Sequence, residues 1–356
     1  MGLVGLRRSA RRAVALAAVG LPVLAGCAAE EAPTAPGDRV IVLQIEVPVR
    51  EPVWSEGVLL ALSEETRQVA RIEPYPPASG APLAARTTLS PLLPDVGENL
   101  AISRTVRGVV YVPQPFLDRV AVLGLRDLRP LGTFQAGPSP SFVAMDVGSQ
   151  VLLALSEGGS TVTGVRVRGF TALRPQEVQA GPAAELDGAE RGRLIEYHVA
   201  GPRGIAHYKG EAGSVQKKDG IAISAHRTAG DMVKPTRLYV AEEGTGRLLA
   251  VGEKPALDGL AVAAEADLGE PVEYLGVDAT RIYAVTRNKL VVLETDSYEG
   301  YHDNKFSIVD TIDFRRPLEG DVLESAPLSG LAVGDDRVYL TLEGEPCVLS
   351  ITKPSI

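Results

Sequence analysis

The chain has 356 residues, of which 45% are hydrophobic and 23% are charged, and its formal net charge is −9. This length is ample for a large hydrophobic core. The acidic balance excludes the broad basic surfaces with which proteins neutralise nucleic-acid phosphates. We therefore expect a folded protein that does not bind nucleic acid.

The first segment of the chain is typical of an export signal. Four arginines, at positions 7, 8, 11 and 12, precede an apolar run from Ala13 to Leu24. A basic start followed by a short apolar run is the pattern of a secretory signal, and this run is too short to span a bilayer permanently. Because the Arg11-Arg12 pair also occurs in twin-arginine signals, the export route (general or twin-arginine) stays open.

The end of the apolar run, Leu24-Ala25-Gly26-Cys27, resembles the lipobox of bacterial lipoproteins. The resemblance implies cleavage after a signal peptide at residues 1–26 and attachment of a lipid to Cys27. The mature protein would then be held at the extracytoplasmic face of the cell membrane. Removal of the four arginines changes the net charge from −9 to −13.

Residues 27–38 are expected to form a flexible tether between the lipid and a folded domain at 39–356. The segment from Ala28 to Asp38 is rich in proline, alanine and acidic residues, a composition that cannot bury enough apolar surface to fold. No later segment offers 18 continuous apolar residues, so the lipid is the expected membrane attachment. With Cys27 lipidated, Cys347 has no disulfide partner, and its apolar surroundings predict a buried, unreactive thiol.

Internal repetition organises the rest of the chain. The heptapeptide VLLALSE occurs at residues 58–64 and again at 151–157, and QAG occurs at 135–137 and 179–181. The segments LGVDATRIYAV from Leu275 and LAVGDDRVYLT from Leu331 also align. A period of 40 to 50 residues predicts a repeat architecture.

Equivalent positions in the repeat define seven units. They are spaced mostly near 44 or 51 residues, and one gap of 86 residues predicts a further unit near position 196, where RLIEYHVA occurs. The marker residues are Leu60, Tyr111, Leu153, Tyr239, Tyr283 and Tyr339.

Each unit reads as several short strands, because β-rich runs such as TVTGVRV alternate in period two between turns rich in Gly, Ser, Asp and Asn. Segments such as VVYVPQP, RLYVAEE and RVYLTLE resemble the YVTN-type repeat of seven-bladed β-propellers. We therefore expect an all-β fold, a seven-bladed β-propeller of four-stranded antiparallel blades.

The two ends of the repeat array predict how the ring closes. The last unit supplies only three strands, whereas the run Val40–Val47 precedes the first full unit and has no blade of its own. An unpaired sheet edge is prone to aggregation. We therefore expect Val40–Val47 to form the outer strand of the last blade.

Candidate metal ligands occur in the atypical fourth unit. His198, His207 and His226 lie within 29 residues, and imidazoles bind zinc or copper where they converge. Their spacing matches no metal motif, so scattered structural histidines are the competing interpretation. The segment 296–310 offers oxygen ligands of the kind that calcium takes, although it lacks the calcium-loop pattern; these are Asp296, Glu299, Asp303 and Asn304.

One locally basic stretch could bind an anionic ligand or a partner. Its candidate residues are Arg203, Lys217 and Lys218, in turns of the same divergent unit. Ordinary solvated turns are the competing interpretation.

The catalytic motifs that a sequence can reveal are missing. Cys-x-x-Cys-His, Gly-x-Ser-x-Gly and phosphate-binding glycine loops do not occur. We therefore expect a lipid-anchored module that binds a protein or a small molecule at the cell envelope, without a cofactor and without catalysis of its own. The alternative is an enzyme that uses the central funnel as a metal-dependent hydrolase or an oxidoreductase. A purely structural role in the envelope is a third possibility.

Overall fold

The computed structural model describes residues 39–74, 84–103, 108–145, 150–178, 182–188, 195–211, 215–254, 259–295 and 301–355. The described residues all belong to one compact unit, Pro36–Ile356. The signal peptide, Cys27 and the tether predicted from the sequence lie outside the described residues.

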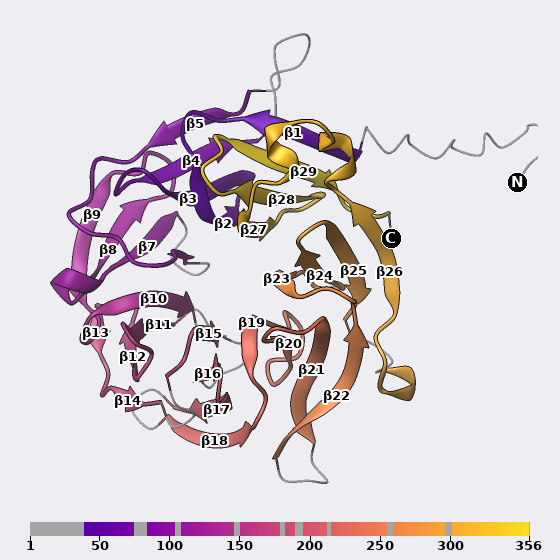
Figure 1. The fold of residues 1–356 in the computed structure, drawn as a ribbon. Coiled ribbons are helices and arrows are strands. Elements are labelled where there is room, and N and C mark those ends of the chain that lie inside the picture. Colours follow the sequence, from indigo (N-terminus) through magenta and orange to yellow (C-terminus); the bar gives the residue numbers. More distant parts are fainter. Residues whose placement is uncertain are drawn as a thin grey trace, which may run out of the picture. The chain divides into compact units, whose positions relative to one another are not determined.

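This unit is a seven-bladed β-propeller, and each blade is an antiparallel sheet (Figure 1). Blade 1 contains β2 (Val49–Ser55), β3 (Val58–Ser63), β4 (Val69–Glu73) and β5 (Arg86–Leu89). Blade 2 contains β6 (Ala101–Ile102), β7 (Val109–Gln114), β8 (Arg119–Gly124) and β9 (Pro130–Gln135). Blade 3 contains β10 (Pro140–Met145), β11 (Val151–Ser156), β12 (Thr161–Arg166), β13 (Thr171–Ala172) and β14 (Gln176–Glu177).

The second half of the ring repeats the same order. Blade 4 contains β15 (Glu185–Gly188), β16 (Ile195–Gly201), β17 (Gly204–Gly210) and β18 (Gln216–Ile221). Blade 5 contains β19 (Ala225–Gly230), β20 (Leu238–Glu242), β21 (Arg247–Lys254) and β22 (Gly259–Asp267). Blade 6 contains β23 (Val272–Val277), β24 (Arg281–Thr286), β25 (Lys289–Glu294) and β26 (Ile308–Asp313). Blade 7 contains β27 (Leu328–Val333), β28 (Arg337–Leu342), β29 (Cys347–Thr352) and β1 (Val40–Gln44).

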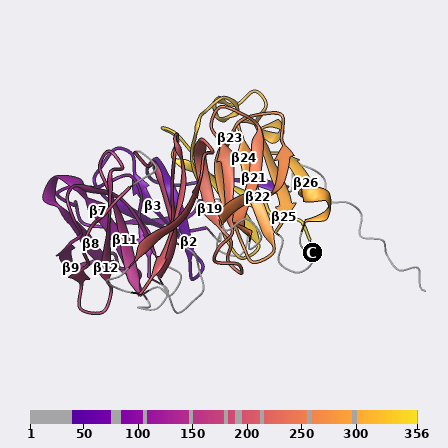
Figure 2. The same ribbon diagram turned by 90° about the horizontal axis from the view of Figure 1, so that it is seen from below.

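The first strand of each of blades 1–6 lies innermost, and the last lies at the rim, so the blades stand around a central axis (Figures 1 and 2). Blade 3 departs from the pattern because two short strands, β13 and β14, both pair with β12 as its outer layer. The sequence prediction of seven antiparallel blades in an all-β ring is confirmed. All the repeat markers lie in second strands, and the unit predicted near position 196 is blade 4, with Tyr197 in β16.

The hydrophobic core lies between the blades, because most second strands carry apolar side chains on both faces. All six residues of β3 are buried. Leu59 packs in one cluster with residues of blade 7, whereas Leu60 packs in another with residues of blade 2. Since successive side chains of a strand point to opposite faces, a continuous apolar run such as VLLALS serves two interfaces at once.

In blades 5 and 6 the recurring tyrosine of the second strand has a polar role as well as an apolar one. Tyr239 donates a hydrogen bond from its hydroxyl to Asp231 (2.5 Å), and Tyr283 donates one to Asp278 (2.7 Å). The second oxygen of each aspartate accepts backbone N–H groups of the turn that leads into the tyrosine strand. The tyrosine therefore joins the blade interior to the turn, since its buried hydroxyl finds a partner there.

The ring closes where the two ends of the propeller sequence meet. β1 pairs with β29 in antiparallel register from Val40↔Ile351 to Gln44↔Cys347. Leu43 is buried in the cluster that joins blades 7 and 1. The predicted closing strand is confirmed, and it ends at Gln44 rather than at Val47.

Replacement of Leu43 by alanine tests the closure. Removal of a buried leucine side chain costs about 2–5 kcal/mol of folding free energy, and here the loss falls on the strand that seals the ring. We expect one cooperative urea transition at a lower midpoint for Leu43→Ala. Leu92→Ala is the matched control, because Leu92 is 63% exposed, and it should shift the midpoint little. Independent melting of blade 7 ahead of the remaining blades would contradict this prediction.

Candidate functional site

A cluster of three charged side chains and one tyrosine, from four blades, lies at the central axis. Glu51 comes from β2 of blade 1, Glu185 from β15 of blade 4, Arg227 from β19 of blade 5 and Tyr274 from β23 of blade 6. Each residue stands near the beginning of an innermost strand. Because these strands occupy the same position in their blades (Figure 1), their first residues gather at one end of the axis. We call these four residues the axial cluster.

Arg227 is the centre of the axial cluster. Its Nη1 donates a hydrogen bond to Glu185 Oε1 at 2.8 Å, and its Nε donates one to the carbonyl oxygen of Glu273 at 3.1 Å. The guanidinium carbon lies 4.8 Å from the centre of the Tyr274 ring, within range of a cation–π contact. On the other side, Nη2 lies 3.9 Å from Glu51 Oε1. Arg227 therefore contacts both neighbouring blades and a blade that is not adjacent to its own.

Irregular backbone directs these side chains toward the axis. The pairing register shifts between Ala225 and Arg227 in β19, and equivalent shifts occur in β2 and β23. Glu51 itself has a φ of 48°, a conformation that non-glycine residues adopt uncommonly. Because a β-bulge leaves one residue unpaired and changes the direction of its neighbours, the innermost strands can direct polar groups inward while their remaining residues pack between blades.

Burial dominates the electrostatics of the axial cluster. Desolvation raises the pKa of Glu185 to about 7, more than the attraction of Arg227 lowers it. Desolvation also raises the pKa of Glu51 above its ordinary value, against the opposite effects of Arg227 and Arg50. The Glu185 side chain is 10% exposed and that of Glu51 is 31% exposed, so water reaches the cluster. The cluster thus holds two carboxyl groups around one shared guanidinium.

The signal for the axial cluster in the amino-acid sequence is weak. Charged residues interrupt the short apolar runs of the innermost strands, in VREPVW, AHRTA and VEYLG. In a single sequence such residues look like ordinary solvent-facing positions of a strand. These residues converge only because the ring closes and because the innermost strands contain β-bulges. A contact between residues 51 and 227 could therefore not be predicted from the sequence.

The structure brings together two of the three histidines predicted as metal ligands. His198 and His207 are cross-strand partners in β16 and β17, and their buried rings stack with centroids 4.7 Å apart. His226 is exposed at the bulge of β19. Among the described residues, one group of three lies close enough to share an ion, and it consists of Glu196, His207 and Glu253.

The predicted basic stretch is spread over two elements of blade 4. Arg203 is exposed in the turn between β16 and β17, whereas Lys217 and Lys218 are exposed in the outer strand β18.

Of the predicted calcium ligands, Asp303 and Asn304 are exposed, and they line a surface depression of about 700 Å³ together with the β22 residues Glu265 and Asp267. Asp296, Glu299 and Cys27 lie outside the described residues.

The thiol of Cys347 is buried, as its apolar surroundings predicted. Desolvation raises its pKa to about 12, which removes the thiolate needed for reactivity near neutral pH.

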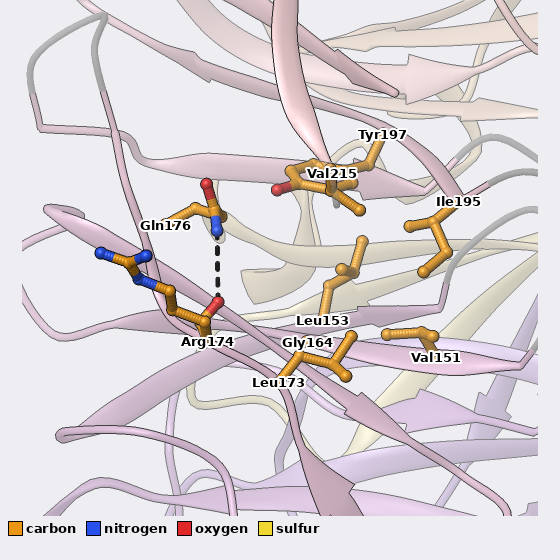
Figure 3. Close-up of a pocket in the computed structure, with 9 residues that line it drawn as sticks. All are labelled: Val151, Leu153, Gly164, Leu173, Arg174, Gln176, Ile195, Tyr197 and Val215. Carbon is orange, nitrogen blue, oxygen red and sulfur yellow. Dashed lines mark hydrogen bonds between the residues drawn. The ribbon is translucent and has the colours of Figure 1, made fainter. Parts of the chain in front are cut away.

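A small apolar cavity lies between blades 3 and 4 (Figure 3). It has a volume of about 30 Å³ and is lined mainly by Val151, Leu153, Leu173, Ile195, Tyr197 and Val215. A space of this size holds about one water molecule, so it cannot accommodate an organic ligand. Compared with this cavity, the axial cluster is the stronger candidate for a binding site.

Helices are scarce in the part of the chain that the structure describes. They are 3-10 turns of three residues, and none is long and apolar enough to cross a membrane.

Comparison with known proteins identifies the fold and not a family. No protein-family model matches the chain, and no curated protein is similar to it in sequence. Among solved structures, 1445 chains are similar. One, from the crystal structure of the mitotic checkpoint complex, has a TM-score of 0.65 and 14% identity over 96% of this chain and 100% of that one.

A second similar chain comes from the hydrazine synthase of Kuenenia stuttgartiensis. Its TM-score is 0.62 and its identity 11%, over 87% of this chain and 97% of that one. One relative in fold thus belongs to a protein complex and the other to an enzyme. Because one fold hosts unrelated functions, these similarities support the β-propeller alone.

The raised pKa of Glu185 gives a testable dependence of stability on pH. Folded Glu185 releases its proton near pH 7, whereas the unfolded residue releases it near 4.5. Between these values the folded state holds the extra proton, so this residue's contribution to stability falls as pH rises from about 4.5 to 7, by at most about 3 kcal/mol. Urea unfolding at pH 5 and pH 8 should therefore show a smaller decrease for Glu185→Gln than for the wild type.

The matched control is Glu294→Gln, which removes a glutamate whose side chain is 49% exposed. It should retain the wild-type decrease. Equal decreases for Glu185→Gln and the wild type would contradict the assignment.

Proposed function

We propose that this chain is an exported, lipid-anchored propeller that binds a positively charged ligand or partner group at the axial cluster, with no catalysis of its own. One observation carries the proposal: two carboxyl groups from different blades, one buried (Glu185) and one partly exposed (Glu51), meet one guanidinium at the axis. The propeller fold is compatible with an interaction module, and the partial exposure of Glu51 and Arg227 leaves the cluster accessible.

The charge of the axial cluster favours a cation as the ligand. Arg227 is shared between Glu185 and Glu51, while Arg50 is engaged by the carbonyl oxygens of Gly97 and Glu98. A raised carboxyl pKa means that the surroundings supply too little positive charge to compensate for desolvation. A primary ammonium or guanidinium group would supply it, displacing the proton of Glu185 as it binds.

The envelope location rests on the sequence. The basic segment, the short apolar run and Leu24-Ala25-Gly26-Cys27 together support export and lipidation. The acidic, proline-containing segment after Cys27 would hold the propeller away from anionic lipid headgroups. A YVTN-type repeat, which the strand segments resemble, is consistent with a ring that presents a binding site.

A second candidate function is catalysis at the same cluster, and the pKa of Glu185 is the observation that favours it. A carboxyl group with a pKa of about 7 is suited to act as a general acid or base near neutral pH. In this version Glu185 transfers a proton while Arg227 positions an anionic part of the substrate. Substrate turnover that is lost in Glu185→Gln would establish this function in place of simple binding.

Lipidation is tested by replacing the cysteine of the lipobox. Without the thiol of Cys27 no thioether to the lipid can form, so Cys27→Ser should abolish incorporation of a labelled fatty acid and move the protein from the detergent phase to the aqueous phase. Cys347→Ser is the control, because that cysteine is buried in blade 7, and it should label like the wild type. Equal labelling of Cys27→Ser would exclude the anchor.

Cation binding is tested with a tetralysine peptide and the same peptide acetylated on its side chains. At pH 8 calorimetry should detect the charged peptide alone, because its ammonium groups complement the carboxylates. Glu185→Gln and Glu51→Gln should each weaken binding about tenfold, the effect of about 1.4 kcal/mol. Glu294→Gln should bind like the wild type, and a uniform response of all variants would place binding elsewhere on the acidic surface.

A further inference from the structure

Beyond the axial cluster, the interface of blades 4 and 5 contains an unusual polar group. Glu196 lies in β16, His207 in β17 and Glu253 in β21 of the next blade. His207 is fully buried, and the Glu196 side chain is 6% exposed. The surrounding interface is otherwise built from apolar residues such as Ile205, Leu249 and Val251. Charged groups in such surroundings are expensive unless they are paired.

One ring nitrogen of His207 has a defined partner. Its Nε2 lies 2.9 Å from Glu196 Oε1. The same Glu196 oxygen accepts a hydrogen bond from the Lys209 ammonium at 3.4 Å. It therefore acts as an acceptor in this group, and Nε2 of His207 donates to it. In this tautomer Nδ1 carries a lone pair that can bind a metal ion.

The other ring nitrogen is buried without a hydrogen-bond partner. Nδ1 of His207 has none, and the carboxylate oxygen Oε1 of Glu253 lies 3.8 Å away, too far for a hydrogen bond. A buried nitrogen that is left unpaired destabilises the folded state. In native proteins such an unpaired buried group usually has a function or binds a water molecule or an ion.

The gap between His207 and Glu253 has the dimensions of a metal site. Zinc binds nitrogen and carboxylate oxygen at about 2.0–2.2 Å, which places two ligands of one ion roughly 3–4 Å apart. The measured separation of 3.8 Å falls in this range. A metal-binding histidine usually donates its other N–H to a carboxylate, which fixes the ring and its tautomer. Glu196 occupies that position on His207.

Lys209 does not oppose a cation in the gap, because it already has a partner. Lys209 lies 3.4 Å from Glu196 Oε1 and balances that carboxylate. The charge of Glu253 then remains to attract an ion, and its side chain, 44% exposed, faces solvent.

We infer that His207 Nδ1 and Glu253 bind a divalent transition-metal ion such as Zn²⁺ between blades 4 and 5, with Glu196 orienting the histidine. The remaining coordination positions are open to water or to a ligand's donor atom. Imidazole and carboxylate together suit zinc. The site joins strands of two neighbouring blades, and it is independent of the axial cluster.

The test is a calorimetric titration of the purified full chain, without a polyhistidine tag, with zinc chloride. The wild type should bind one Zn²⁺ at this site. Glu253→Gln should lose at least tenfold in affinity, because it removes a charged ligand whose exposed position makes misfolding a minor concern. Glu196→Gln should retain both ligands yet lose about 10–100-fold, the usual effect of removing the carboxylate that orients a metal-binding histidine.

The matched control is Glu294→Gln, which changes a partly exposed glutamate near the end of β25, the equivalent strand of blade 6. It should titrate like the wild type, and zinc bound elsewhere on the acidic surface would appear equally in all variants. Identical titrations of the wild type and Glu253→Gln, or no saturable binding to the wild type, would overturn the inference.

Discussion

The pairing of β1 with β29 is the interaction on which the rest of the structure depends. A propeller blade is stable only between two neighbours, because its second strand is apolar on both faces. Every blade therefore needs a closed ring, and closure here rests on five residue pairs between segments about 300 residues apart in sequence. By completing blade 7, β1 also covers the edge of β29, which would otherwise offer unpaired backbone groups.

Closure also creates the conditions for the axial cluster. Once the ring is sealed, the innermost strands are fixed relative to one another, and polar groups at their bulges meet across the axis. Arg227 and Glu185 attract each other, yet the desolvation of Glu185 is the larger effect. A charge pair whose carboxyl group still favours its proton contributes little to stability. The pair is better explained as part of a site that binds a positively charged group than as an interaction that stabilises the contact between blades.

The fold could be predicted from the sequence because local patterns that recur along the chain determine it. VLLALSE, RIYAV and RVYLT each predict an apolar second strand, and the unmatched run at Val40 predicts the closing strand. The candidate sites were harder to predict from the sequence. His207 was recognised as a ligand type, but its partner Glu253 lies in another blade. The distance between the side chains of His207 and Glu253, which are 46 residues apart in the sequence, depends on the twist of the blades and on their β-bulges. No pattern in a single sequence predicts that distance.

The exchange of a strand between the first and last units has a consequence for the timing of folding. Synthesis delivers β1 before the other strands that the structure describes, yet its partner β29 becomes available only after six blades have been made. Until then β1 remains an unsatisfied apolar segment, and contacts of such long sequence separation form slowly. During this interval the exposed apolar segment makes the nascent chain prone to aggregation.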